Sequence, residues 1–158
     1  MMNESYLMVR RHPYEEPDHT QLEFIVSNGS FTGGIDFYCG VDDIANIGTA
    51  LRAFPRSISD EYVYEYGSPV ASKRFYRHFR LRAYTIDRSG HCALQITINL
   101  NRDEPEEGIC RFSMRCEPWS LERLGNLFLA FARLEHLEFK WVPNTEIEEM
   151  YTEYQGHW

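Results

Sequence analysis

Histidines and carboxylates gather near the start of the chain, between residues 12 and 19. The members are His12, Glu15, Glu16, Asp18 and His19. Imidazole and carboxylate groups can hold a divalent metal or exchange protons with a substrate. Their spacing matches no ligand motif, and Pro13 and Pro17 break the segment, which leaves it without the rigid support that such a centre needs. The pattern favours a solvated arm, and we predict neither a metal nor a cofactor.

Cations alternate with aromatic residues between positions 73 and 82. The segment reads Lys-Arg-Phe-Tyr-Arg-His-Phe-Arg-Leu-Arg, and such interleaving is typical of surfaces that bind single-stranded nucleic acid. On a strand, however, Phe75 and Phe79 would be buried while Arg80 and Arg82 would be exposed. The simpler interpretation is a sheet face whose arginines pair with carboxylates. A contact with an anion or an acidic protein is the next alternative.

Catalytic and phosphate-binding motifs are missing from the sequence. Gly33-Gly34 has no following Lys-Ser/Thr, no Gly-x-Gly-x-x-Gly occurs, and no serine lies in a Gly-x-Ser-x-Gly setting. His78 and His91 flank a predicted hairpin, but the sequence places no nucleophile and orienting acid beside them. We therefore predict that the protein is not an enzyme.

The charge balance bears on the choice of partner. The net charge of −8 argues against general nucleic-acid binding and against an anionic membrane, because phosphates attract cationic surfaces. A basic protein is the better partner. No apolar run approaches the ~20 residues of a membrane span, and Glu4, Arg10 and Arg11 interrupt the N-terminal stretch where a signal peptide needs an apolar core. We expect a cytoplasmic protein with reduced cysteines.

A strand followed by a helix occurs twice in the chain. Residues 35–54 match residues 112–131 without a gap when they are shifted by 77 positions. The identical pairs are Cys39 with Cys116, Gly48 with Gly125, Ala53 with Ala130, and Phe54 with Phe131. This match predicts an internal duplication of a hairpin-strand-helix-strand unit.

The predicted fold is a single α+β domain, residues 1–158, with a mostly antiparallel sheet and two helices packed against it. Apolar residues at spacings of three and four predict helices over 44–54 and 121–134, with Asp43 and Ser120 as N-caps. The half-repeats span 20–67 and 73–142. An N-terminal arm covers 1–19, and an acidic tail covers 143–158.

Smaller signals fill in this outline. Asn28-Gly29 and Gly90 predict the turns of two hairpins, and Thr145 to Glu148 form a capping-box pattern that predicts a short helix in the tail. Gly48 and Gly125 lie on the apolar stripes of the two helices, where they are expected to let helix and sheet approach closely.

The order of the elements resembles the small acidic bacterial proteins of the WapI-type immunity group and related uncharacterised families. The resemblance rests on this layout, on Ser30-Phe-Thr-Gly-Gly-Ile-Asp-Phe-Tyr38 leading into the first helix, and on Ser120-Leu-Glu-Arg-Leu-Gly125 opening the second. It covers most of residues 20–142. It implies a binding protein that neutralises a toxin by occluding it, with no cofactor.

The predicted function is thus a non-catalytic protein-binding module of the immunity type. Aromatic anchors and complementary charge suit association with a basic protein. The residues expected to contact it are exposed aromatics and acids, namely Tyr62, Tyr64, Tyr66, Asp103, Glu104, Glu106 and Glu107. Two alternatives remain: a small enzyme or ligand-binding domain with a pocket between the two halves, and a homodimer with no bound ligand.

Overall fold

The computed structural model describes residues 4–73 and 76–156. Arg74, Phe75 and Trp158, which belong to the predicted basic strand and tail, lie outside the described residues. The elements in chain order are β1 (Ser5–His12), β2 (His19–Asn28), β3 (Thr32–Gly40), α1 (Val41–Arg52), β4 (Glu61–Tyr66), a 3-10 turn η1 (Ala71–Lys73), β5 (His78–Thr85), β6 (Cys92–Asn99), β7 (Ile109–Cys116), α2 (Pro118–Phe131), β8 (Glu138–Trp141) and β9 (Glu148–Tyr151).

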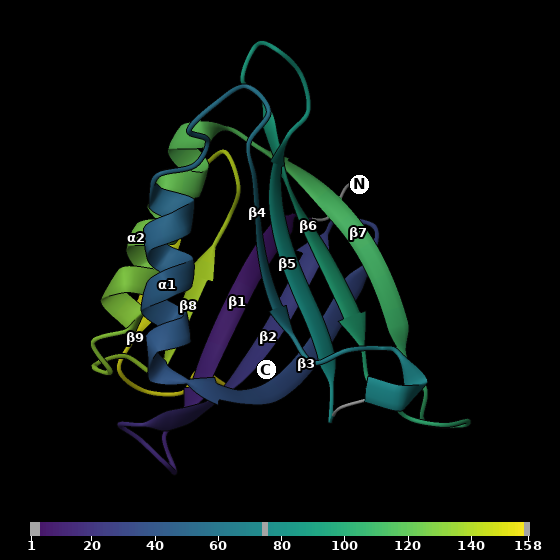
Figure 1. Ribbon diagram of the computed structural model, residues 1–158. Coiled ribbons are helices and arrows are strands. Elements are labelled where there is room, and N and C mark those ends of the chain that lie inside the picture. Colours follow the sequence, from purple (N-terminus) through teal and green to yellow (C-terminus); the bar gives the residue numbers. More distant parts are fainter. Residues whose placement is uncertain (1–3, 74–75, 157–158) are drawn as a thin grey trace.

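The strands form two antiparallel sheets, which pack against each other and against the two helices (Figure 1). Sheet A has the order β3-β2-β1-β8-β9, and sheet B has the order β4-β5-β6-β7. Phe24 of sheet A stacks on Phe79 of sheet B with ring centroids 4.6 Å apart. The α+β class is confirmed, but the strands divide into two sheets because each sheet covers the apolar face of the other.

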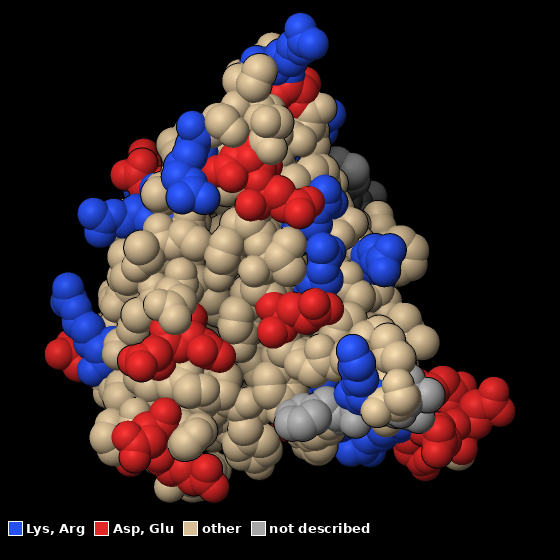
Figure 2. All heavy atoms as spheres, viewed as in Figure 1, with Lys and Arg blue, Asp and Glu red and all other residues tan. Residues whose placement is uncertain are grey.

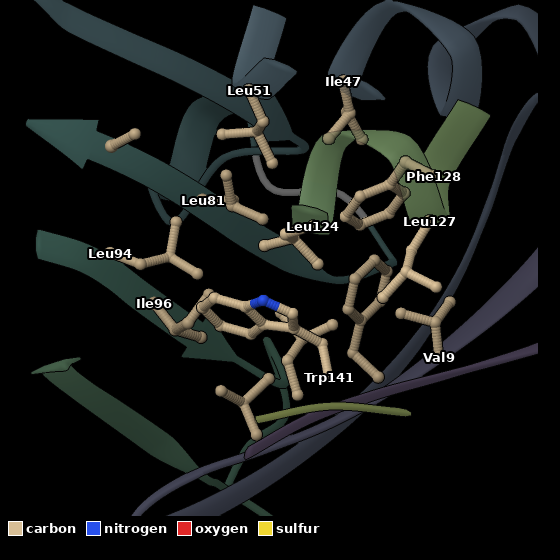
Figure 3. Packing of buried hydrophobic residues seen from close by; sticks show 14 of the residues in the cluster. Val9, Ile47, Leu51, Leu81, Leu94, Ile96, Leu124, Leu127, Phe128 and Trp141 are labelled. Atoms are coloured by element: carbon tan, nitrogen blue, oxygen red, sulfur yellow. The ribbon is translucent and has the colours of Figure 1, made fainter. Parts of the chain in front are cut away.

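The core lies between the inner faces of the sheets and the helix pair. Strand alternation directs Leu94, Ile96 and Ile98 of β6 inward, and all three are buried. Figure 3 shows Trp141 of β8 beside Ile96 and below Leu124 of α2. The indole N–H of Trp141 donates to the carbonyl of Ser120 at 3.0 Å, so the largest core side chain leaves no polar atom unpaired.

Both helices begin one turn earlier than predicted. The N-caps are Gly40 and Glu117, and neither makes a side-chain capping bond. Pro118 takes the first turn of α2, where its missing N–H costs nothing. Ser120 is instead buried, and its hydroxyl accepts the N–H of Asn144 at 2.8 Å. The predicted caps at Asp43 and Ser120 are therefore wrong.

Gly48 and Gly125 join the two helices to each other, not to a sheet. A methyl group added at Gly48 would lie 2.9 Å from the carbonyl oxygen of Gly125, and one added at Gly125 would lie 2.7 Å from that of Gly48. Such distances are too short for any side chain. The two positions were correctly placed on buried stripes, but the close approach that they permit is between α1 and α2.

The repeated unit has five elements, and the two copies of the unit exchange their end strands. At the 77-residue shift, the first residues of β3, α1 and β4 fall on those of β7, α2 and β8. The β2–β3 and β6–β7 pairings correspond when β2 is shifted by 72 positions instead, because Phe24 then falls on Ile96, which pairs with Phe112 as Phe24 pairs with Ile35. The units are β1-β2-β3-α1-β4 and β5-β6-β7-α2-β8. The last strand of each unit pairs with the first strand of the other.

The N-terminal segment is a strand, not the start of an arm. β1 lies at the centre of sheet A between β2 and β8, so only residues 13–18 separate it from β2. The sequence predicts only a short strand over residues 6–9, because two prolines and a run of polar residues follow it and favour a loop. Arg11, however, is 3% exposed and donates to the carbonyl of His136 at 2.7 Å and to Glu16.

The predicted helix in the tail does not form. Residues 148–151 become β9, which pairs with β8. Thr145 closes a turn instead: its hydroxyl donates to the carbonyl of Val142 at 2.9 Å and accepts the N–H of Ile147 at 3.0 Å. In the part of the chain that the structure describes, neither α1 nor α2 is long and apolar enough to cross a membrane.

Candidate functional site

The outer face of sheet B carries arginines on two of its strands. Alternation along β5 turns Arg80, Arg82 and Tyr84 outward, because Phe79, Leu81 and Ala83 between them are buried in the core. The same alternation turns Arg111 and Arg115 of β7 outward. We call this surface the arginine face, defined by Arg80, Arg82, Tyr84, Arg111 and Arg115.

The strand register brings these residues together across β6. Arg80 lies opposite Thr97, which lies opposite Arg111. One row further along β5, Arg82 lies opposite Gln95, and in the next row Tyr84 lies opposite Ala93. Residues directly opposite each other on one face have Cβ atoms about 5 Å apart. The two arginine-bearing strands therefore flank a central strand with short or uncharged side chains.

Arg82 and Tyr84 are held in place by their neighbours. The Nε of Arg82 donates to Oε2 of Glu61 at 2.6 Å, and its guanidinium lies 4.0 Å from the centroid of the Tyr84 ring. The hydroxyl of Tyr84 donates to Oγ of Ser113 at 3.3 Å, which stretches the ring across the sheet from β5 to β7. An aromatic ring fixed along a sheet surface is a platform on which a planar group can stack.

The other arginines of this face lack acidic partners. Arg80 lies opposite Glu65 of β4, whose carboxylate bonds His78, and Arg80 itself donates to the amide oxygen of Gln95 at 3.4 Å. Among the described residues no carboxylate forms an ion pair with Arg80, Arg111 or Arg115. Figure 2 shows Lys and Arg side chains over β5 and β7, with Asp and Glu at the β4 side and on the β6–β7 loop. Within the segment 73–82, the predicted pairing with carboxylates is met at Arg82 and at Arg77, which lies 3.5 Å from Asp36, and is not met at Arg80.

The free edge of β7 adds hydrogen-bond donors beside the arginine face. The backbone groups of Arg111, Ser113 and Arg115 point away from β6, since bonding alternates along an antiparallel pair and Leu100 N–H bonds the carbonyl of Gly108. The carbonyls of Ser113 and Arg115 accept the side-chain amides of Asn28 and Asn144, at 3.3 and 3.2 Å. The edge is left rich in donors, which suits an anion.

An open hollow of about 390 Å³ continues the arginine face at the β5–β6 turn. Arg82, Tyr84 and Arg88 line it together with Ile58, which is exposed. On its rim, the carboxyl of Asp60 accepts the backbone N–H of Arg56 at 2.8 Å, and this bond holds the pKa of Asp60 below its usual range. The carboxylates of Asp60, Glu61 and Asp87 line it as well, so the hollow presents charges of both signs beside its aromatic wall.

The predicted contact tyrosines lie on the inner side of sheet B. Tyr62, Tyr64 and Tyr66 are half-buried and pack against the core. The ring of Tyr66 stacks on Phe37 at 4.7 Å, and the hydroxyl of Tyr64 donates to Asp43 at 3.0 Å. Burial raises the pKa of Tyr64 well above its usual value. Their predicted exposure is wrong, because Tyr64 pairs with Leu81 and so shares its buried face.

The predicted contact acids form no common surface with those tyrosines. Asp103, Glu104, Glu106 and Glu107 are exposed on the loop between β6 and β7. Alternation along β4 carried a signal for this burial, because three tyrosines form one face of the strand and Glu61, Val63 and Glu65 form the other.

The histidine and carboxylate candidates are dispersed. His12 bonds Glu23 at 3.0 Å, His78 bonds Glu65 at 2.7 Å, and His91 bonds Asp87 at 2.7 Å. His78 and His91 lie at opposite ends of the β5–β6 hairpin, so the fold does not bring them together. Within residues 4–73 and 76–156, no group of three His, Cys, Asp or Glu side chains is placed to hold a metal ion. All four cysteines are free.

No protein-family model matches the chain, and no curated protein matches it. Among solved structures, it is similar to the plant transcriptional regulator PBF-2, with 10% identity, a TM-score of 0.45, and coverage of 84% of this chain and 80% of that chain. It is also similar to WHY1 from Arabidopsis thaliana, with 10% identity, a TM-score of 0.47 and the same coverage of both chains.

These comparisons contradict the predicted function and partners. The structures found are plant proteins, one of them a transcriptional regulator, so they lend no support to the predicted bacterial, immunity-like protein-binding module with a basic partner. Net charge alone does not exclude nucleic acid either. The net charge misled on this point, because −8 is a sum over the entire chain, whereas a ligand meets only the local charges of one face.

Proposed function

We propose that this protein binds single-stranded nucleic acid on the arginine face of sheet B. The observation that carries this proposal is the group of Arg80, Arg111 and Arg115, which are unpaired with described carboxylates and lie on the same sheet face as the ring of Tyr84. Arginines left without protein partners can neutralise phosphates, and an aromatic platform stacks bases of any sequence. The proposed activity is binding alone, and it keeps the prediction that the protein is not an enzyme.

The shape of the face favours a single strand over a duplex. A duplex is read by a helix or a two-stranded ribbon that enters the major groove, and the arginine face is one side of a four-stranded sheet. Unpaired bases can turn toward such a surface and stack on Tyr84, while the phosphates meet the arginines. The short side chains of β6 between the two arginine rows leave room for the strand to lie flat.

Carboxylates border the face and confine the ligand to it. Glu61 and Glu65 lie on β4 beside the β5 row, and the acidic loop of residues 102–107 lies at the start of β7. These groups repel phosphate outside the arginine rows. We therefore expect a short footprint and binding that weakens steeply with salt, with a slope of about −0.7 in log affinity per phosphate contacted.

The test is fluorescence anisotropy of a labelled, mixed-sequence oligonucleotide, measured over a range of salt concentrations. Changing Arg80, Arg111 and Arg115 together to Gln is expected to abolish measurable binding, because each hydrogen bond to a charged group contributes about 1.5–3 kcal/mol. The salt slope should fall by about 0.7 for each arginine removed.

The matched control changes Arg52, Arg123 and Arg133 to Gln, which alters the net charge equally on and beside the helices, away from sheet B. Its affinity is expected to stay within about threefold of wild type, since exposed charges at a distance are screened. An equal loss in both triple variants would mean that bulk charge, not the arginine face, holds the ligand. Absence of binding by the wild-type protein at low salt would overturn the proposal.

The cytoplasmic location and the homodimer stay predictions.

A further inference from the structure

Thr97 lies at the centre of the arginine face with a hydroxyl group that has no hydrogen-bond partner among the described residues. The residue is 6% exposed, and its Oγ1 is buried without a hydrogen bond. Buried hydroxyl groups in folded proteins nearly always have a partner, so an orphan on an otherwise regular central strand requires an explanation. A valine at this position would fill the same space and leave nothing unsatisfied.

The two neighbours of Thr97 on this face are both arginines. Thr97 pairs directly with Arg80 of β5 and with Arg111 of β7. Neither guanidinium is ion-paired within the described part of the chain, and the side-chain hydrogen bond of Arg80 to Gln95 is long enough at 3.4 Å to be exchanged for a better one. Thr97 therefore lies between two arginines on the same face, and all three side chains can donate hydrogen bonds.

We propose that Arg80, Thr97 and Arg111 form a subsite for one phosphate group of the bound strand. This inference rests on the proposed function and names the part of the face that holds the backbone. Three donors without an acceptor select a group that only accepts, and the non-bridging oxygens of a phosphodiester do so. A base edge, which mixes donors and acceptors, fits less well. On binding, the side chains of Arg80 and Arg111 turn toward the phosphate and uncover the hydroxyl, which donates to a third lone pair.

The subsite makes a prediction that a structural role does not share. Thr97→Val removes the hydroxyl and keeps the shape, so the melting temperature should stay the same or rise, while affinity for the oligonucleotide falls about tenfold. Because this change removes no charge, the salt slope should not change, whereas Arg80→Gln or Arg111→Gln should each lower it by about 0.7. Thr97→Ser restores the hydroxyl and should recover most of the affinity.

The matched control is Thr20→Val on the other sheet. Thr20 is also buried on a strand, at 1% exposed, but its hydroxyl donates to Oε2 of Glu16 at 2.8 Å. The control should therefore lower the melting temperature and leave oligonucleotide affinity unchanged. The two valine variants are expected to move stability in opposite directions and affinity only at Thr97.

The outcomes separate the subsite from the function on which it rests. If Thr97→Val binds like wild type while the triple arginine variant does not, the subsite is wrong and nucleic-acid binding stands. If the wild-type protein binds no oligonucleotide, the proposed function fails first. An NMR titration of the wild type with inorganic phosphate needs no variant to fold: shifts centred on Thr97, Arg80 and Arg111 would support the subsite, and shifts elsewhere alone would contradict it.

Discussion

The outer faces of sheets A and B come from corresponding strands but differ in what their cations contact. On sheet A, Arg10 donates to Glu138 at 2.8 Å, and Lys140 pairs with Glu4 at 3.0 Å. Residues 152–156 then cover part of that face. On sheet B, three arginines meet no described carboxylate. A cation on a sheet surface therefore has a structural role when a carboxylate pairs with it and a segment of the chain covers it. A cation without either is available to a ligand.

The largest effect is expected from disrupting the ion pair between Arg10 and Glu138 on the outer face of sheet A. Arg10→Gln leaves the carboxylate of Glu138, which is 2% exposed, without its cation. Removing one member of a buried pair typically costs about 3–5 kcal/mol, because the other charge stays buried. Urea unfolding should show this loss of stability. Arg115→Gln on the arginine face should change stability by less than about 0.5 kcal/mol. Equal losses of stability at both positions would contradict the difference between the two sheets.

The next effect concerns Tyr84, the aromatic residue of the arginine face. Tyr84→Leu removes the stacking platform and should weaken oligonucleotide binding by about 1–3 kcal/mol, as measured by anisotropy. Tyr84→Phe is the control, because it keeps the ring and loses only the bond to Ser113. The Phe variant should bind like wild type. If both variants bind equally weakly, the hydroxyl matters and stacking does not.

A smaller effect is expected from detaching the segment that covers sheet A. The hydroxyl of Tyr154 donates to the carbonyl of Arg11 at 2.8 Å, and the guanidinium of Arg10 lies 4.9 Å from its ring centroid. Tyr154→Ala should cost about 1 kcal/mol and speed amide exchange over residues 152–156. Oligonucleotide affinity should not rise, because the cations beneath stay paired. A gain in affinity would show that residues 152–156, and not the ion pairs beneath them, keep the outer face of sheet A from binding the oligonucleotide.

The smallest effect is local and depends on pH. At the turn of sheet B, the carboxyl of Asp87 accepts the His91 ring N–H at 2.7 Å and the backbone N–H of Ser89 at 2.9 Å, and these bonds lower its pKa. A carboxyl with a lowered pKa stabilises the folded turn above its unfolded value of 3.8, and this contribution is lost as the pH falls through the folded pKa. Amide exchange at Ser89 should therefore accelerate below about pH 4, and Asp87→Asn should remove the pH dependence.

Much of the fold follows from local patterns in the sequence. Apolar and polar residues alternate from Ile109 to Cys116, which are the observed bounds of β7, and Asn28-Gly29 predicted a hairpin whose Gly29 has a φ of 92°. The duplication was visible because core positions tolerate few changes. The errors came where a polar residue has a specific buried partner, as Arg11 has in Glu16, because an arginine in sequence carries no sign of the carboxylate that will meet it.

The arginine face was only partly predictable. Alternation within residues 73–82 placed Arg80 and Arg82 on an exposed face, but it could not say which of them would find a carboxylate. Arg111 and Thr97 join them through the registers of two strand pairs, which depend on how the sheet as a whole buries its apolar side. The missing partner of Thr97 is visible only in three dimensions, since an unsatisfied hydroxyl and a satisfied one are the same letter.

The exchange of end strands between the two units says something about how such a chain could arise. β4 completes the sheet of the second unit and β8 completes the sheet of the first, so neither unit can close its own sheet. A peptide with one unit alone would leave a strand without a neighbour and would need a second copy to accept it. Fusing two copies makes that meeting intramolecular and independent of concentration. Once the copies were fused, the cations of one sheet could keep their carboxylate partners and covering segment while those of the other lost them. Two identical chains could never diverge in this way.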